Sequence, residues 1–164
     1  TSGGDTLFAS MYAAYEALSG RLQRFLGELT AVHDGQQYYV GRYGGRDLRD
    51  GAYPSAEHPA IRTHPVTGRR ALYVNEGFTT GFKELKQAES NALLAFVLKH
   101  CAAPEFQCRF RWRQNSVAFW DNRCTQHHAI WDYYPQTRHG YRVTIKGDRP
   151  FYAEADVDGR RAVP

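Results

Sequence analysis

The stretch EFQCRFRWR, residues 105–113, constrains the fold most, because apolar and polar side chains alternate along it with a period of two. Successive side chains of an extended strand point to opposite sides, so this alternation predicts a half-buried strand. Its apolar face would consist of Phe106, Cys108, Phe110 and Trp112. Gln114 and Asn115 are predicted to form a turn, and two further strand-like runs follow, SVAFW at 116–120 and YRVTIKG at 141–147.

Elsewhere the period of the apolar residues changes to that of helices. Apolar residues at helical spacing predict helices over residues 6–18, 20–29 and 84–100. Residues 34–57 are rich in Gly, Tyr, Arg and Asp and are predicted to form a long loop. Shorter signals predict a strand edge with a turn at 59–68 and a strand at 70–75.

These elements favour a mainly β fold with flanking helices, of the antiparallel sandwich or jelly-roll type. The sequence shows no strand–helix–strand alternation that would indicate a doubly wound sheet. Its 164 residues suit one domain with a hydrophobic core, covering residues 1–164. The polar residues from about 153 to 164 are predicted to be a loose tail.

Charge, hydropathy and cysteine usage exclude several classes of protein. The net charge of +4 is scattered without a dense basic block, so no nucleic-acid partner is expected; weak nucleic-acid binding is the alternative that this charge allows. No apolar run approaches the roughly 18 residues of a membrane-spanning helix. The three cysteines lack C-x-x-C spacing, which favours reduced thiols in a cytoplasmic protein.

Residues 119–148, FWDNRCTQHHAIWDYYPQTRHGYRVTIKGD, gather the side chains with most chemistry. His127 follows the predicted strand that ends at Trp120, and an imidazole there can bind a metal, shuttle protons or be a hydrogen-bonded rim histidine. His128 would point the other way in an extended backbone. Arg138 and Arg142 are suited to a carboxylate or sulfonate, because guanidinium forms paired charge-assisted hydrogen bonds. Two surface arginines paired with Asp or Glu remain the alternative.

Three segments, in the same order, resemble the taurine dioxygenase (TauD/TfdA) family of Fe(II)- and 2-oxoglutarate-dependent dioxygenases. They are GGDTLFASMYAAYEALS near the start, RTHPVTGRRALYVNEGFTT at 62–80, and WDNRCTQH followed by YYPQTRHGYRVTIKGDRPF. Together they cover most of residues 3–152. The resemblance implies a double-stranded β-helix, which is a jelly roll, with Fe(II) as cofactor and 2-oxoglutarate as cosubstrate.

The resemblance also implies roles for six residues. His127 matches the distal iron-binding histidine, Arg138 the arginine that grips the far carboxylate of 2-oxoglutarate, and Thr6 the threonine that assists it. Arg142 matches the arginine that holds the acidic head of the prime substrate. Two aromatic residues fall where the family lines its substrate pocket, Phe78 and Tyr39.

The implied activity is hydroxylation of a small anionic substrate such as taurine, another sulfonate or an alkyl sulfate. O₂ is consumed, and succinate and CO₂ are released. Family members often assemble as dimers or tetramers, so the resemblance allows a homo-oligomer.

The family's first metal motif, H-x-D, has no match among the seven histidines of this chain. In the family it lies before the GGDT segment, which places it upstream of Thr1. We therefore expect the chain to be the C-terminal part of a dioxygenase domain and to be inactive by itself. The alternative is a non-catalytic jelly roll or anion-binding module without a complete iron site.

Overall fold

The computed structural model describes residues 3–43 and 53–153. Among them the strands are β1 Thr6–Ser10, β2 Thr30–Asp34, β3 Ser55–Pro59, β4 Ile61–Thr63, β5 Arg70–Leu72, β6 Thr79–Phe82, β7 Gln107–Phe110 and β8 Thr125–Ala129. The helices are α1 Met11–Glu16, α2 Gly20–Gly27, α3 Gly35–Tyr43 and α4 Gln87–Cys101, with a 3-10 turn at Pro104–Phe106. None of the helices described is long and apolar enough to cross a membrane.

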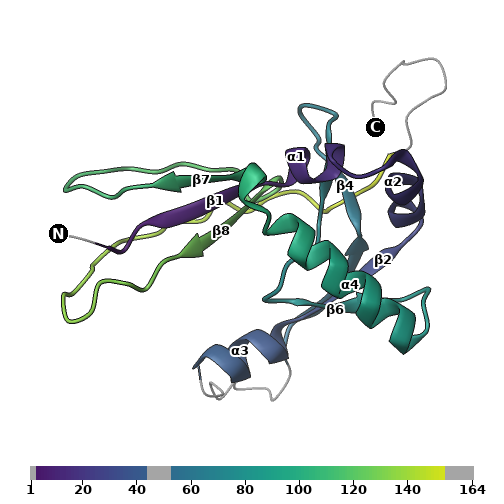
Figure 1. Cartoon of the computed structure of the whole chain (residues 1–164), viewed down its shortest axis with the longest axis horizontal. Helices are drawn as coiled ribbons and strands as arrows, with labels where there is room; N and C mark the ends of the chain where they lie inside the picture. The colour runs from purple at the N-terminus through teal and green to yellow at the C-terminus, as the bar shows by residue number, and fades with distance from the viewer. Residues whose placement is uncertain (1–2, 44–52, 154–164) are drawn as a thin grey trace.

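The strands form two antiparallel sheets of three strands, ordered β7-β1-β8 and β3-β2-β6, and the hairpin β4-β5. Figure 1 shows β7, β1 and β8 projecting to one side of the molecule, away from α2 and α4. α1 lies against β5, and α4 lies against β6. The first sheet is therefore joined to the rest of the molecule at the end where β1 continues into α1.

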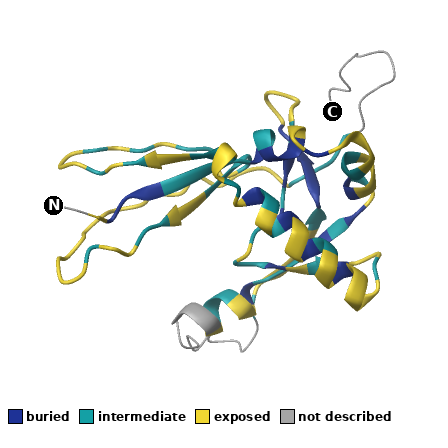
Figure 2. Cartoon of the chain, viewed as in Figure 1, coloured by how far each residue is buried: buried dark blue, intermediate teal, exposed yellow. Residues whose placement is uncertain are grey.

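The core lies where the helices meet the hairpin and the second sheet, away from the projecting sheet (Figure 2). Its most deeply buried side chains are Met11, Leu26, Ile61, Leu72, Val74 and Val97. The side chain of Ser19 accepts a hydrogen bond from Leu22 N at the start of α2, and this satisfies one amide that the helix leaves unpaired. The predicted helices at 20–29 and 84–100 are confirmed as α2 and α4.

The predicted helix at 6–18 is wrong in its first half. Residues Thr6–Ser10 form β1, the central strand of its sheet, which pairs with β7 on one side and β8 on the other. Two ladders of backbone hydrogen bonds outweigh a helical pattern of apolar residues. The helix begins only after Ser10, whose hydroxyl accepts a hydrogen bond from Ala13 N at 3.3 Å.

The predicted long loop at 34–57 is also wrong where the structure describes it. The carboxylate of Asp34 accepts a hydrogen bond from Gln36 N at 2.7 Å, and α3 follows it. Residues 55–59 form β3, which pairs with β2. Residues 44–52 lie outside the described part of the chain.

The strands predicted at 116–120 and 141–147 are not found as strands, and the strand predicted at 105–113 is confined to β7. Cys108, predicted to be on a buried face, is exposed. Val117 is 87% exposed, Phe119 88% and Val143 94%. The described chain provides neither a strand partner nor a covering layer for these runs. Figure 2 shows the exposure along the projecting part of the molecule.

Of the loose tail predicted from about residue 153, the structure describes only Ala153, which is hydrogen-bonded to Thr63. Ala153 N donates a hydrogen bond to the hydroxyl of Thr63 at 2.9 Å, and Thr63 N donates to the carbonyl of Phe151 at 2.8 Å. Residues 154–164 lie outside the described part. Cys101, Cys108 and Cys124 carry free thiols, as predicted.

Candidate functional site

The register of β1 and β8 places two of the predicted site residues on one face of the sheet. His127 pairs with Phe8, and Ala129 pairs with Thr6. Directly opposed residues in an antiparallel pair share a face, and alternate residues along a strand share one too. Thr6 and His127 therefore lie on the same face. His128 pairs with Leu7 and lies on the opposite face.

His127 lies inside β8, although the sequence had suggested a position just beyond a strand. The pattern missed β8 because TQHHA is polar, and the strand exists through its pairing with β1. Aromatic rings surround the imidazole, with the ring centroid of Trp120 at 5.1 Å and that of Phe8 at 6.3 Å. These rings limit the orientations that the exposed imidazole can adopt.

Gln126, which precedes His127 in β8, anchors this strand to the core. The side-chain amide of Gln126 donates a hydrogen bond to the carbonyl of Val74, and it also contacts the sulfur of Met11 at 3.1 Å. Val74 and Met11 are both buried. Because Gln126 and His127 lie on opposite faces of β8, this anchor holds the strand from behind the imidazole.

A second group on the same side of the sheet contains Thr6, Trp112 and Arg138. The indole N–H of Trp112 donates to the buried hydroxyl oxygen of Thr6 at 2.9 Å. The guanidinium carbon of Arg138 lies 5.4 Å from the centroid of the Trp112 ring, within the range of a cation–π contact. Among the described residues Arg138 forms no ion pair with a carboxylate. The group thus offers a cation beside a hydroxyl.

Gly4 allows Arg138 to reach this position. Its φ is +74°, a backbone conformation that residues with a Cβ rarely adopt. A Cβ at this position would come 3.0 Å from Cδ of Arg138. The amide of Gly4 donates to the carboxylate of Asp132 at 2.7 Å, which joins the segment preceding β1 to the segment that leads to Arg138. A side chain at residue 4 would displace the arginine.

The other predicted site residues do not join these two groups. Arg142 is exposed, and it forms no hydrogen bond or ion pair within the described chain. The ring of Phe78 lies 4.6 Å from that of Tyr38, and Tyr38 in turn lies 5.7 Å from Tyr39. Phe78 and Tyr39 therefore belong to a separate aromatic row, which Tyr53 extends by stacking on Tyr39 at 6.1 Å.

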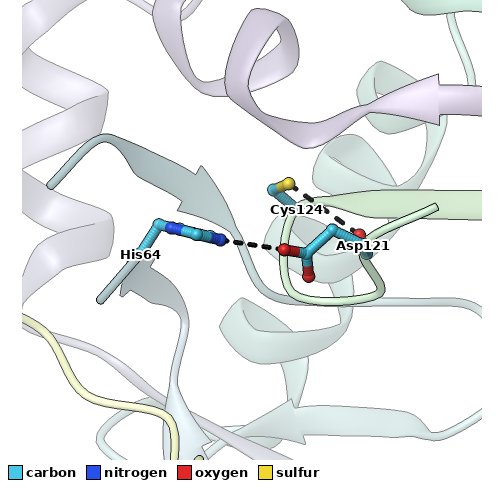
Figure 3. Close-up of side chains that lie close together, drawn as sticks. All are labelled: His64, Asp121 and Cys124. Atoms are coloured by element: carbon cyan, nitrogen blue, oxygen red, sulfur yellow. Dashed lines mark hydrogen bonds and ion pairs between the residues drawn. The ribbon is translucent and has the colours of Figure 1, made fainter. Parts of the chain in front are cut away.

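Sequence reasoning missed a polar cluster formed by His64, Asp121 and Cys124, whose possible ligand atoms all lie within 4.8 Å of one another (Figure 3). Nδ1 of His64 accepts hydrogen bonds from the amides of Val66 and Thr67, each at 3.2 Å. This fixes the proton on Nε2, which donates to Asp121 Oδ2 at 3.0 Å. The nitrogen that would have to bind a metal is therefore a donor, so the cluster is a hydrogen-bonded support.

Asp121 is held from a second side by Arg123. Nε and Nη2 of Arg123 donate to the carboxylate at distances of 2.7–3.0 Å. These bonds, followed by the one from His64, hold the pKa of Asp121 well below its usual range. His64 opens the HPVTG motif and Asp121 lies in WDNR, but no local signal in either motif pairs the two residues.

A half-buried histidine in β2, His33, makes a testable contribution to stability. Burial, followed by the nearby His58, lowers the pKa of His33 to about 4, against about 6.5 in an unfolded chain. The neutral form is favoured on folding, so the stabilisation is complete above pH 6.5 and is lost as the pH falls toward 4. After allowance for partial exposure of the ring, we expect the free energy of unfolding to be about 1 kcal/mol lower at pH 5 than at pH 7.5.

Urea unfolding at the two pH values measures this difference. His33→Gln should remove most of it, whereas the exposed control His139→Gln should keep it. Equal pH dependence in wild type and His33→Gln would contradict this assignment.

The donor set at His127 fits one position of an iron site. A two-His, one-carboxylate site needs three protein ligands on one side of the metal. Among the described residues, the only group of His, Cys, Asp and Glu close enough to share an ion is the His64 cluster, which does not include His127. The described residues therefore do not complete such a site around His127. The cation and hydroxyl of Arg138 and Thr6 suit the distal carboxylate of a dicarboxylic acid.

Comparison with known proteins gives consistent matches over nearly the whole chain. The model of the taurine catabolism dioxygenase TauD, TfdA family matches residues 1–144. An α-ketoglutarate-dependent sulfonate dioxygenase of Saccharomyces cerevisiae is 37% identical over 90% of this chain and 36% of its own length. An α-ketoglutarate-dependent sulfate ester dioxygenase of Pseudomonas putida is 36% identical over 97% of this chain and 54% of its own length.

A solved structure agrees with these matches. A taurine dioxygenase from Burkholderia xenovorans superposes with a TM-score of 0.70 at 38% identity, over 82% of this chain and 43% of that one. The chain thus spans about a third to a half of the length of the relatives it matches. The segments that match carry the face with Thr6 and His127.

Proposed function

The chain belongs to the TauD/TfdA family of dioxygenases, and from this premise we propose that the complete protein is an Fe(II)- and 2-oxoglutarate-dependent dioxygenase acting on small anionic substrates. One observation carries the proposal. The register of β1 and β8 gathers the imidazole of His127 and the hydroxyl of Thr6 on one face, and Trp112 joins Arg138 to that hydroxyl. The proposed metal ligand and the proposed carboxylate-binding pair would then lie on a common side of the sheet.

In this proposal each residue has a distinct task. His127 supplies one imidazole to the iron, and Phe8 and Trp120 keep its ring in place. Arg138 and Thr6 hold the distal carboxylate of 2-oxoglutarate by charge and hydrogen bonding, which orients its keto-acid end toward the metal. When bound, iron and 2-oxoglutarate supply the oxidation of a C–H bond by O₂, with release of succinate and CO₂.

Arg142 is proposed to hold the acidic head of the prime substrate. A guanidinium binds the oxygens of a sulfonate or sulfate ester through paired hydrogen bonds, and the arginine is exposed without a competing carboxylate in the described chain. Phe78 and Tyr39 are proposed to line the apolar part of the substrate site. The names of the yeast and Pseudomonas relatives support a sulfonate, such as taurine, or an alkyl sulfate as the substrate class.

Chain outside these 164 residues is proposed to complete the site and the jelly roll. The relatives are two to three times as long as the region that matches. In the described structure His127 belongs to no group of three potential metal ligands. Apolar side chains are also exposed there, at Val117, Phe119, Tyr141, Val143 and Ile145. An additional layer would cover such residues and could bring the missing histidine and carboxylate.

The substrate class is tested by measuring succinate release by the complete protein with Fe(II), 2-oxoglutarate and O₂. Alkyl sulfonates, alkyl sulfates and carboxylates of matched chain length form the panel. We expect a sulfonate or sulfate to stimulate succinate release at least about tenfold over its carboxylate match, because the two head groups differ in shape and in number of acceptor oxygens. Anion binding without substrate-dependent succinate release would instead support a non-catalytic binding module.

A further inference from the structure

A buried arginine in β4 begins a network of ion pairs that lies outside the proposed ligand contacts. Arg62 is only 2% exposed, and its Nη2 lies 2.7 Å from Oδ2 of Asp148. The other oxygen of Asp148 lies 3.4 Å from Nη1 of Arg123. A cation this deeply buried requires a paired anion. The carboxylate of Asp148 is therefore held beside Arg62 of β4.

The same strand end holds a second carboxylate. His64, two residues after Arg62 and 5% exposed, donates from Nε2 to Asp121, and Asp121 binds Arg123. Arg123 thus bridges the two carboxylates while Arg62 and His64 each hold one of them. We refer to Arg62, His64, Asp121, Arg123 and Asp148 as the clasp.

The clasp joins the two ends of one segment. Asp121 precedes β8 and Asp148 follows the stretch 138–142, so the segment between them carries His127, Arg138 and Arg142. The structure also fastens the first end by a hydrogen bond from Met11 N to the carbonyl of Cys124 at 2.9 Å, immediately before β8. Both ends of the segment that bears these three side chains are therefore tied, through a carboxylate each, to Arg62 in β4 or to His64 directly after it.

We propose that the clasp is a positioning device for the metal and cosubstrate sites; this inference rests on the function proposed above. The His64–Asp121 arm sets where β8 begins and so positions His127. The Arg62–Asp148 arm sets where the returning chain lies and so positions Arg138 and Arg142. Arg123 keeps the two arms in register. None of the five residues is expected to contact a ligand, so each acts through the side chains that it positions.

The two arms predict separable effects on two probes of the complete protein. The probes are Mn(II), whose free concentration is measured by electron paramagnetic resonance, and N-oxalylglycine, titrated calorimetrically into the Mn(II)-loaded protein. Asp121→Asn should weaken Mn(II) binding by about 10- to 100-fold, as expected when the support of a metal ligand is lost. Asp148→Asn should weaken N-oxalylglycine binding by a similar factor and leave Mn(II) binding within about threefold of wild type.

Matched variants separate positioning from general loss of structure. Glu16→Gln removes a comparable carboxylate from the exposed Arg69–Glu16 pair and should leave both affinities unchanged. Arg123→Lys cannot bridge both carboxylates, so it should weaken the binding of both probes. Because it keeps the positive charge, the loss should be smaller than in Arg123→Ala. If an aspartate variant does not fold, this lysine–alanine comparison decides the question on its own.

The outcomes distinguish the two proposals. Weaker Mn(II) binding in Asp121→Asn, together with weaker N-oxalylglycine binding alone in Asp148→Asn, supports the clasp. A wild type that binds both probes, with aspartate variants that lose both equally or neither, overturns the clasp and leaves the proposed function standing. A wild type that binds neither probe overturns the proposed function and the clasp with it.

Discussion

His127→Ala is expected to reduce substrate-dependent succinate release by the complete protein by at least about 100-fold, because even the supports of metal ligands commonly contribute 10- to 100-fold. The imidazole lies on the face that also carries Thr6, beside the rings of Phe8 and Trp120. Alanine leaves these rings in place and removes the nitrogen ligand. The affinity for Mn(II) should fall together with the activity, which distinguishes loss of the metal from loss of the substrate site.

His128→Ala is the matched control for this prediction. His128 is also exposed in β8, but it pairs with Leu7 and points away from the site. We expect its variant to keep activity and Mn(II) affinity within about threefold of wild type, as is usual for exposed positions away from a site. An active His127→Ala protein, or equal losses in the two variants, would show that this face does not hold the metal.

Arg138→Ala is expected to raise the KM for 2-oxoglutarate by roughly 30- to 150-fold, from the loss of a charge-assisted pair that contributes about 2–3 kcal/mol. The guanidinium lies against Trp112, whose indole binds the hydroxyl of Thr6. Removal of the cation should leave Mn(II) binding intact, because the proposed metal ligand His127 lies elsewhere on the sheet. Initial rates over a range of 2-oxoglutarate concentrations, with saturating iron, measure the effect.

Arg138→Lys should fall between wild type and Arg138→Ala, since an ammonium keeps the charge but lacks the planar fork. The control Arg21→Ala removes an exposed arginine from α2, and its KM should not change. A large fall in kcat with an unchanged KM for 2-oxoglutarate would assign Arg138 a different role.

The sequence predicted helices where packing and pattern agree, and it failed where long-range pairing decides. The helix α4 lies close to the predicted range, and it buries Leu94, Val97 and Cys101 at helical spacing. Thr6–Ser10 has the same kind of spacing, yet it becomes a strand because partners about a hundred residues away or farther pair with both of its edges. No local pattern in the first twenty residues contains that information.

In the candidate site, too, the sequence identified individual residues but not the long-range contacts between them. The resemblance to known dioxygenases identified Thr6, His127 and Arg138 as candidates, but only the strand register shows that Thr6 and His127 share a face. The contacts of the clasp connect positions 57 and 86 residues apart, from His64 to Asp121 and from Arg62 to Asp148. Such pairs depend on the folded topology, so neither spacing nor composition could reveal them.

A crystal structure of the complete protein with Mn(II) and N-oxalylglycine tests the central claim most directly. We predict that an imidazole nitrogen of His127 coordinates the metal and that the distal carboxylate of N-oxalylglycine contacts both Arg138 and Thr6. A metal held without His127, or a distal carboxylate bound by a different cation on another face, would contradict the account.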